Sequence, residues 1–362
     1  MLLAGGGTGG HLFPAVALGQ LLLKRDTNAE ILFVGTRRGI EYRLLSQLQL
    51  PLKTIDMVGV IGRGWRGRLE LIPKLIRSLF QAQRILRQFK PDLVVGFGGY
   101  VSVPVLMAAK VLHVPYLIHE QNAIPGLSNK LLARGAATIC ISYADTLNYF
   151  QRDKVRLTGN PLRQGLDQID EELPMPGQVL VFGGSRGARA INEAMIACLS
   201  ELLNWPEPPQ IVHQTGEDDY LWVKEAYAAA GYLRAEIVPF IDNMAEAYAR
   251  SSLVVCRAGA TSLAELTVCG RPAILIPFPH AAGDHQNANA RALERAGAAV
   301  VLQQQDLTGF RLATELRILL ADREHLQLMA QRGRSIARPD AATKILTECR
   351  KLVNSSVTAE VS

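Results

Sequence analysis

The chain lacks the signatures of a membrane-spanning, a secreted or a metal-bound protein. None of its apolar runs reaches the roughly eighteen residues that a membrane-crossing helix needs. Its five cysteines are scattered, and none of them forms a Cys-x-x-Cys pair. We therefore expect reduced cysteines in a cytosolic protein, with neither a disulfide framework nor a zinc site. Because the chain opens directly into an apolar stretch and a glycine turn, we also expect no signal peptide.

Two nucleotide-binding motifs and a nucleic-acid-binding surface are missing as well. No glycine-rich stretch ends in Gly-Lys-Ser or Gly-Lys-Thr, which excludes a P-loop, and the first glycines are too dense to identify a dinucleotide fingerprint. Aromatic residues make up only 6% of the chain, and no basic platform carries interleaved aromatic residues. We therefore expect no nucleic acid partner.

What the chain does have is an uneven distribution of charge. Residues 1–165 hold 21 Lys and Arg against 9 Asp and Glu, whereas the remainder holds 18 against 24. Between residues 61 and 90, eight basic residues stand beside one acid, Glu70. A positive field of this kind attracts phosphates, whether they belong to nucleic acid, anionic lipid or a diphosphate substrate.

The pattern of apolar runs predicts an α/β protein with two Rossmann-like domains. Short apolar runs alternate with amphipathic stretches, which is typical of buried parallel strands with helices on both faces of the sheet. The predicted strands are residues 1–4, 31–34, 93–95, 116–118, 138–141, 179–182, 210–213, 253–256 and 273–276. A break across residues 160–177 separates a domain of residues 1–162 from one of residues 163–338. A helix over 339–353 and a disordered polar tail over 354–362 are expected to follow.

Glycine-rich turns follow three of the predicted strands. One runs from Gly5 to Gly10 and leads into His11, a second includes Gly98-Gly99, and the third is Gly183-Gly184-Ser185. Glycine permits a positive φ, and the helix start that follows presents free N–H groups, which together often hold a phosphate. A purely structural tight turn is the alternative. His11 adds an imidazole, a group that exchanges protons near neutral pH.

Polar side chains gather after other strands. Residues 119–122, His-Glu-Gln-Asn, either bind a ligand or cap the next helix. In the second domain, the turn 257–265 combines Arg257 and hydroxyl groups with Glu265, whose carboxylate either pairs with two ribose hydroxyls or caps the helix. Residues 284–287, Asp-His-Gln-Asn, suit the hydroxyls of a sugar, and a metal is disfavoured because no third ligand has a helpful spacing.

The stretch 71–89 reads as an amphipathic helix with a basic face. Its apolar positions at helical spacing are Leu71, Ile72, Leu75, Ile76, Leu79, Ile85, Leu86 and Phe89, and its basic positions are Lys74, Arg77 and Arg84. A core helix with a solvated basic face is one interpretation. The other, favoured by the basic cluster and Trp65, is a helix that contacts anionic lipid at a membrane surface.

Seven short motifs occur in order: Gly-Gly-Thr-Gly-Gly-His (6–11), Gly-Gly-Tyr (98–100), His-Glu-Gln-Asn (119–122), Asn-Pro-Leu-Arg (160–163), Gly-Gly-Ser (183–185), Arg-Ala-Gly-Ala (257–260) and Asp-His-Gln-Asn (284–287). This ordered set resembles the MurG family of peptidoglycan N-acetylglucosaminyltransferases, from residue 1 to about residue 350. The resemblance implies a GT-B fold, with two domains facing across a cleft and a C-terminal helix that returns to the first. It also implies inverting transfer of N-acetylglucosamine from UDP-N-acetylglucosamine to the C4 hydroxyl of undecaprenyl-linked N-acetylmuramyl-pentapeptide, which converts lipid I to lipid II without a cofactor.

The same resemblance assigns roles to individual residues. It implies that His11 is the general base, with Glu120 as the second candidate. The residues implied on the acceptor side are Gly98, Gly99 and Tyr100. Those implied in binding the donor are Thr8, Gly9, Gly10, Asn122, Arg163, Ser185, Ile241, Arg257, Ala260, Thr261, Ser262, Glu265, Gln286 and Asn287. Within this set the Ile241 backbone is implied to contact the uracil, the 260–265 turn the diphosphate and ribose, and the last two residues the sugar hydroxyls.

The resemblance further implies a peripheral protein on the cytoplasmic face of the cell membrane. Lipid I and an anionic membrane surface are the implied partners besides the sugar nucleotide, and cell-wall synthesis proteins are further candidates. Three alternatives stay open: another GT-B transferase with a lipid acceptor, a UDP-sugar 2-epimerase, and a scaffold that binds a UDP-sugar without turnover. The combination of residues 119–122 with residues 284–287 disfavours the first, and two half-sites on one chain disfavour the last.

Overall fold

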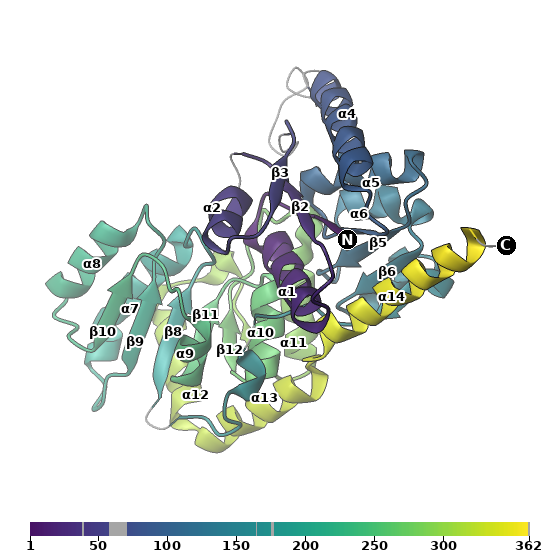
Figure 1. The fold of residues 1–362 in the computed structure, drawn as a ribbon. Coiled ribbons are helices and arrows are strands. Elements are labelled where there is room, and N and C mark those ends of the chain that lie inside the picture. The colour runs from purple at the N-terminus through teal and green to yellow at the C-terminus, as the bar shows by residue number, and fades with distance from the viewer. Residues whose placement is uncertain (38–39, 58–70, 164, 175–176, 361–362) are drawn as a thin grey trace. The chain divides into compact units, whose positions relative to one another are not determined.

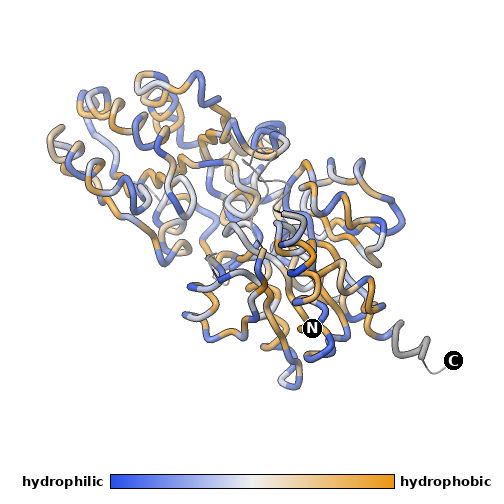
Figure 2. Tube along the Cα trace, turned by 90° about the horizontal axis from the view of Figure 1, so that it is seen from above, coloured by the Kyte–Doolittle hydropathy of each residue, from blue (hydrophilic) through white to orange (hydrophobic). Residues whose placement is uncertain are grey.

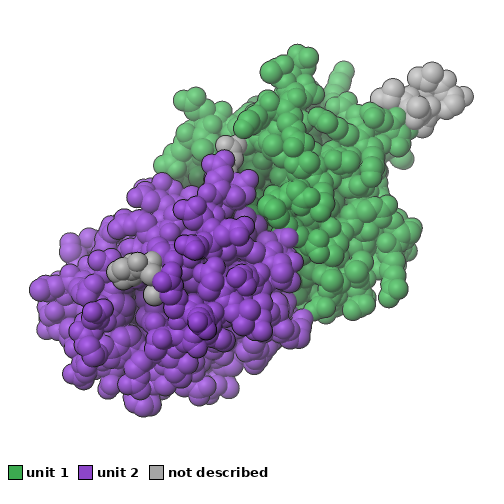
Figure 3. Space-filling view, turned by 90° about the horizontal axis from the view of Figure 1, so that it is seen from below, with its two compact units in different colours: residues 1–163, 338–362 green, residues 164–337 purple. Residues whose placement is uncertain are grey.

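Two parallel β-sheets, each covered by helices, form the framework of the chain (Figure 1). The computed structural model describes the 362 residues except 38–39, 58–70, 164, 175–176 and 361–362. The chain divides into two compact units, residues 1–163 with 338–362 and residues 164–337, which Figure 3 colours separately. The predicted α/β class with two Rossmann-like units is therefore confirmed.

The first unit contains a seven-stranded sheet in the order β3-β2-β1-β4-β5-β6-β7, and all of its neighbouring strands pair in parallel. Its strands are β1 (Leu2–Ala4), β2 (Leu32–Gly35), β3 (Leu52–Thr54), β4 (Val94–Gly96), β5 (Tyr116–Glu120), β6 (Thr138–Ile141) and β7 (Val155–Leu157). Its α-helices are α1 (Gly9–Arg25), α2 (Ile40–Gln47), α4 (Leu71–Phe89), α5 (Gly99–Val111), α6 (Leu127–Leu132) and α14 (Ala341–Glu360). The central strands β1, β4, β5 and β6 are buried along their whole length, which explains their continuous apolar runs.

The second unit contains a six-stranded parallel sheet in the order β10-β9-β8-β11-β12-β13. Its strands are β8 (Gln178–Phe182), β9 (Gln210–Gln214), β10 (Ala235–Val238), β11 (Ser251–Cys256), β12 (Ala273–Leu275) and β13 (Ala299–Val301). Its α-helices are α7 (Arg189–Leu203), α8 (Tyr220–Ala229), α9 (Met244–Ala249), α10 (Ala260–Cys269), α11 (His285–Arg295), α12 (Gly309–Ala321) and α13 (Arg323–Ile336). The colouring by hydropathy in Figure 2 allows the reader to follow apolar and polar segments along the trace.

The C-terminal helix α14 packs on the first unit and is longer than the sequence predicted. Ile345, Leu346 and Cys349 join the same buried cluster as residues of α1, and the Arg25 guanidinium donates to the Thr343 hydroxyl at 2.8 Å. The stretch 354–362 was expected to be a disordered tail, but the helix continues to Glu360. No Pro or Gly interrupts this stretch, so nothing in it stops an established helix from propagating.

Candidate functional site

Three of the predicted site segments follow neighbouring strands of the first sheet. Strands β1, β4 and β5 are adjacent, with Ala4 in register with Gly96 and Gly96 with Ile118. Residues 5–11 and 97–100 follow β1 and β4, and residues 119–122 span the end of β5. Parallel strands end at the same edge of their sheet, so the topology gathers these segments at one place, where ligands of α/β proteins usually bind.

His11 lies in the first turn of α1, between a threonine and a pair of glycines. Its Nδ1 atom is 3.1 Å from the Thr8 hydroxyl oxygen. Gly99 has a φ of +76°, and a Cβ built on it would lie 2.5 Å from the Gly6 carbonyl oxygen and 3.2 Å from His11 Nδ1. Only glycine allows this approach, so Gly99 brings the start of α5 against the imidazole.

A buried carboxylate that sequence analysis did not single out supports the first glycine turn. Glu41, on α2, is fully buried. One of its oxygens accepts hydrogen bonds from the Thr36 amide at 2.9 Å and the Thr36 hydroxyl at 2.8 Å, and the other accepts from the Gly7 amide at 3.4 Å. Glu41 therefore links the end of β2 to the turn before His11. Its one signal in the sequence is an acid in a basic region.

Both carboxylate oxygens of Glu120 accept hydrogen bonds from the protein itself. Oε1 accepts from the Asn122 backbone amide at 2.9 Å and its side-chain amide at 3.2 Å. Oε2 accepts from the Gly126 amide at 3.0 Å and the Asn129 side chain at 2.8 Å. Burial raises the pKa of this carboxyl. These hydrogen bonds show that Glu120 orients Asn122. An internal network of this kind is the alternative to ligand binding that the sequence left open for residues 119–122.

His119 is a buried neutral imidazole in the same network. Its Nε2 donates to the Gly159 carbonyl at 3.0 Å, and its Nδ1 accepts from the Gln121 side-chain amide at 3.2 Å. Burial lowers the pKa of His119 from 6.5 to about 4. The bond to Gly159 ties the end of β5 to the segment that leads to Arg163.

Acid should destabilise both units through two buried histidines. In the second unit, His213 lies 3.0 Å from the Asn192 amide oxygen, and burial lowers its pKa from 6.5 to about 3. Both histidines have a lower pKa in the folded state, so the unfolded chain binds more protons as the pH falls below about 6.5, and stability present above that pH is lost. We expect each site to lose about 2 kcal/mol of unfolding free energy between pH 7 and pH 5.

Urea unfolding curves at the two pH values would measure this loss. A His213→Gln variant should lack the part of the loss that belongs to the second unit. A pH-independent unfolding free energy in the parent protein would contradict the prediction.

Arg163 ends the first unit and stacks on an aromatic ring. Its guanidinium carbon lies 4.1 Å from the centre of the Phe13 ring of α1. A Cβ on Gly9 would lie 2.9 Å from that ring, so Phe13 lies between the glycine turn and the guanidinium. Phe13 is not among the predicted site residues, because in the sequence it occupies an ordinary apolar position of a helix.

The remaining predicted residues follow strands of the second sheet. Ser185 is exposed in the turn after β8, where Gly184 has a φ of +93°. Ile241 follows β10 and is half-buried. Ala260, Thr261 and Ser262 form the first turn of α10, after β11. The first amides of a helix have no partner within it, so this turn can donate to an anion.

Two charged residues near the α10 turn are engaged by the protein itself. The Arg257 guanidinium donates to the Ile276 and Pro277 carbonyls at 3.0 and 3.2 Å and to the Gln304 side chain at 2.7 Å. Burial lowers the pKa of Arg257 to about 10. Glu265 is 2% exposed and accepts from the Tyr248 hydroxyl at 3.1 Å. Arg257 thus stabilises the chain at the end of β12. A direct hydrogen bond from Arg257 to a diphosphate remains a prediction.

Gln286 and Asn287 lie in the first turn of α11 and are half-buried. The Gln286 side-chain oxygen accepts from the Phe278 amide at 2.9 Å. The Asn287 side chain donates to Asp284 and accepts from Gln303, both at 3.1 Å. Within the described ranges, no group of three or more His, Cys, Asp and Glu side chains could hold a metal ion.

The basic helix α4 presents apolar side chains to two sides. Ala82, Ile85 and Leu86 are buried in the core of the first unit, but Ile76 and Phe80 are 51% and 64% exposed. The sequence placed Ile76 in the apolar stripe of the predicted helix, whose role stayed open between core and membrane contact, and that stripe did not include Phe80. A surface hollow of about 610 Å³ is lined by Pro73, Ile76, Arg77, Phe80, Gln81 and Arg84. The basic residues Arg63, Arg66 and Arg68, together with Trp65 and Glu70, lie outside the described residues.

Helix α5 contacts both α4 and α6, and α5 and α6 also carry exposed apolar side chains. Two residues four positions apart are exposed on each: Met107 and Val111 on α5, and Leu127 and Leu131 on α6. Helices α4, α5 and α6 contain no Asp or Glu; their basic residues are Lys74, Arg77, Arg84, Arg87, Lys110 and Lys130. The nearby Asp56 pairs with Arg77 at 3.1 Å. Among the helices that the structure describes, none is long and apolar enough to cross a bilayer.

Comparison with known proteins matches both halves of the chain to one enzyme family. The N-terminal domain of glycosyltransferase family 28 matches residues 1–141, and its C-terminal domain matches residues 178–345. A UDP-N-acetylglucosamine–N-acetylmuramyl-(pentapeptide) pyrophosphoryl-undecaprenol N-acetylglucosamine transferase from Syntrophotalea carbinolica is 53% identical over 355 residues, 97% of this chain and 98% of that protein. The enzyme of the same name from Geobacter metallireducens is 47% identical over 96% of this chain and 97% of its own length.

Solved structures give the same picture of the fold. MurG from Acinetobacter baumannii has a TM-score of 0.76 at 34% identity and covers 97% of this chain and 99% of its own. A UDP-GlcNAc 2-epimerase from Neisseria meningitidis, solved with UDP-GlcNAc, has a TM-score of 0.67 at 13% identity, with 97% and 99% covered. At that identity the epimerase is similar in fold alone.

Proposed function

The chain belongs to glycosyltransferase family 28, and from that premise we propose that it transfers N-acetylglucosamine from UDP-N-acetylglucosamine to undecaprenyl-pyrophosphoryl-N-acetylmuramyl-pentapeptide. The observation that carries this proposal is the 53% identity, over nearly the full length of both chains, to a transferase of that name. The reaction forms lipid II, a precursor of peptidoglycan. Both half-sites described above have the residue types that such a transfer needs.

The proposed mechanism is a single displacement at the anomeric carbon of the donor sugar. The C4 hydroxyl oxygen of the acceptor forms the new bond as the bond to the UDP phosphate oxygen breaks, which inverts the anomeric centre. His11 accepts the hydroxyl proton. The charge that develops on UDP is stabilised by N–H groups of the turn after β8 and of the first turn of α10.

Product analysis tests this proposal against its alternatives. The protein is incubated with UDP-N-acetylglucosamine, with and without a lipid I analogue, and both UDP and lipid products are measured. We expect UDP release that depends on the acceptor, together with a disaccharide-linked lipid. UDP release or epimerised sugar without acceptor would support the epimerase alternative, and binding without turnover would support a scaffold.

We further propose that the surface of α4, α5 and α6 binds anionic lipid at the cytoplasmic face of the membrane. The exposed pairs on the three helices supply apolar area, and the absence of acids in these helices leaves their positive charge in excess. Apolar insertion and attraction to anionic headgroups act together in peripheral binding. This surface would bring a lipid-linked acceptor to the protein without a spanning helix.

Replacing Ile76 and Phe80 with glutamate should reduce binding to anionic vesicles about tenfold or more, because two exposed apolar groups become charges of the lipid's sign. Sedimentation with phosphatidylglycerol-containing vesicles at low and high salt would measure the bound fraction. Phe310→Glu is the matched control, since Phe310 is 69% exposed on the second unit. Binding that is indifferent to lipid charge, salt and the double substitution would contradict the proposal.

A further inference from the structure

The turn after β8, which carries Ser185, packs against the end of β9 through two facing glycines. Gly187 has a φ of +74° and Gly216 a φ of +84°. A Cβ on Gly187 would collide with the Thr215 carbonyl oxygen, and a Cβ on Gly216 would collide with the Arg186 carbonyl oxygen. The two backbones therefore touch, and the position of the β8 turn depends on the segment 214–216.

Gln214, the last residue of β9, makes the side-chain bond between these segments. Its side chain is buried, and its Nε2 donates to the Gly184 carbonyl oxygen at 2.8 Å. The same carbonyl accepts from the Gly187 amide at 2.9 Å. Gly184 has no Cβ and a positive φ, so this peptide has unusual rotational freedom, and the two hydrogen bonds fix its direction.

Fixing this carbonyl also fixes the amide on the other side of the same peptide. Peptide units are planar and almost always trans, so the C=O of Gly184 and the N–H of Ser185 point in opposite directions. With the carbonyl held toward Gln214, the Ser185 N–H points away from β9. That is the direction in which a donor could reach a ligand rather than the protein interior.

We propose that Gln214 is a positioning residue for the diphosphate of the donor, which it serves by orienting the Ser185 amide toward a phosphate oxygen. The inference rests on the proposed function, because it takes a nucleoside diphosphate as the ligand of this turn. It adds to that function a residue which does not touch the ligand. It also explains why residue 184 is a glycine, because the peptide orientation requires a positive φ at this position.

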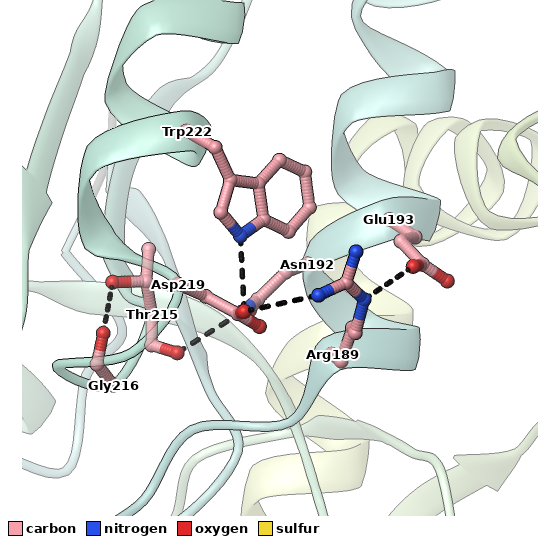
Figure 4. A network of polar contacts seen from close by, with 7 residues as sticks. All are labelled: Arg189, Asn192, Glu193, Thr215, Gly216, Asp219 and Trp222. Atoms are coloured by element: carbon pink, nitrogen blue, oxygen red, sulfur yellow. Dashed lines mark hydrogen bonds and ion pairs between the residues drawn. The ribbon is translucent and has the colours of Figure 1, made fainter.

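A polar network secures the segment that follows Gln214 (Figure 4). The Asn192 amide of α7 donates to the Thr215 carbonyl at 3.0 Å and to Asp219 at 2.8 Å. Asp219 also accepts from the Trp222 indole at 2.9 Å and lies 3.7 Å from the Arg189 guanidinium. These contacts secure the segment after β9 against the start of α7.

The same segment is bonded to the end of β10. The Thr215 amide donates to the Val238 carbonyl at 3.0 Å, and the Gly216 amide donates to the Pro239 carbonyl at 3.2 Å. Residue 239 lies two positions before Ile241, the residue expected at the base. The segment 214–216 therefore contacts both the turn after β8, which carries Ser185, and the turn after β10, which carries Ile241, and it fixes the position of each relative to the other.

The test compares affinities for UDP and uridine by calorimetric titration or competition. In Gln214→Leu and Gln214→Glu we expect UDP affinity to fall about tenfold, as for the loss of one oriented donor, while uridine affinity is unchanged. The KM for the lipid acceptor should also stay the same. Gln178→Leu is the matched control, because Gln178 is a buried glutamine at the amino end of neighbouring β8 and should keep both affinities.

The outcomes separate this inference from the proposed function. If both variants bind UDP as tightly as the parent protein, or lose UDP and uridine affinity in equal measure, Gln214 has no positioning role. If the parent protein itself binds no UDP, the proposed function fails together with the inference. A fall in the ratio of UDP to uridine affinity, confined to the Gln214 variants, supports it.

Discussion

The His11→Ala variant is expected to lose about 10²- to 10⁴-fold in kcat, the usual contribution of a general base, while it keeps its affinity for the nucleotide donor. The imidazole lies in the first turn of α1, against the Thr8 hydroxyl and Gly99. Apart from Arg163, the residues proposed to bind the UDP moiety belong to the second unit, so we expect UDP binding to survive removal of the ring. Initial-rate kinetics with a lipid I analogue, together with UDP titration, would measure both quantities.

Two further variants sharpen this test. Thr8→Val removes the hydroxyl beside Nδ1 but keeps the base, so we expect a loss of only about tenfold from poorer ring orientation. His325→Ala changes an exposed histidine of α13 and should have no effect on kcat. Turnover in His11→Ala equal to that of the parent protein would exclude His11 as the base.

How far the fold could be predicted depended on the burial of each strand. The nine apolar runs all correspond to strands, within one to two residues at either end. Within the described ranges, the structure adds β3, β7, β10 and β13, and each of these lies at an edge of its sheet. Edge strands have one unpaired side and are only partly buried, so they need no continuous apolar run and give no such signal.

The sequence predicted at which strand ends the site residues lie, but it did not predict which groups their side chains contact. Glycine turns and polar clusters after apolar runs indicate where a ligand binds, because their spacing is local in sequence. Arg257, in contrast, donates to a side chain 47 residues away, and Glu41 bonds an amide 34 residues away. Whether a charged side chain such as Arg257 or Glu41 contacts a ligand or bonds the protein itself depends on how segments far apart in the sequence pack together.

The orientation of α4 shows the same limit on a helix surface. Leu75 and Ile76 are both strongly apolar, yet Leu75 packs against the core and Ile76 is exposed. An apolar stripe wider than the buried face leaves its flank in solvent. The sequence therefore predicted an amphipathic helix but could not decide which of its apolar residues remain available to a membrane.

The second large effect is expected from Glu120→Ala, which should lower the unfolding free energy of the first unit by about 3–5 kcal/mol and turnover by about 10²-fold or more. The substitution leaves four donors, which belong to Asn122, Gly126 and the buried Asn129, without their acceptor. Asn122 then loses the orientation on which its expected role in binding the donor depends. Urea unfolding and initial rates below the unfolding transition would measure the two losses separately.

A Glu120→Gln variant decides whether Glu120 positions other groups or accepts the proton. Glutamine keeps one oxygen for Asn122 but turns its amide toward the donors of Gly126 and Asn129, so we expect a smaller loss of stability than in the alanine variant. If Glu120 only positions Asn122, the acidic limb of the pH–rate profile persists in Glu120→Gln and disappears in His11→Ala. The reverse pattern would make Glu120 the base and His11 the positioning residue. The four hydrogen bonds on Glu120 favour the first result, because an oxygen that already accepts two protein donors has little capacity to take a proton from a substrate.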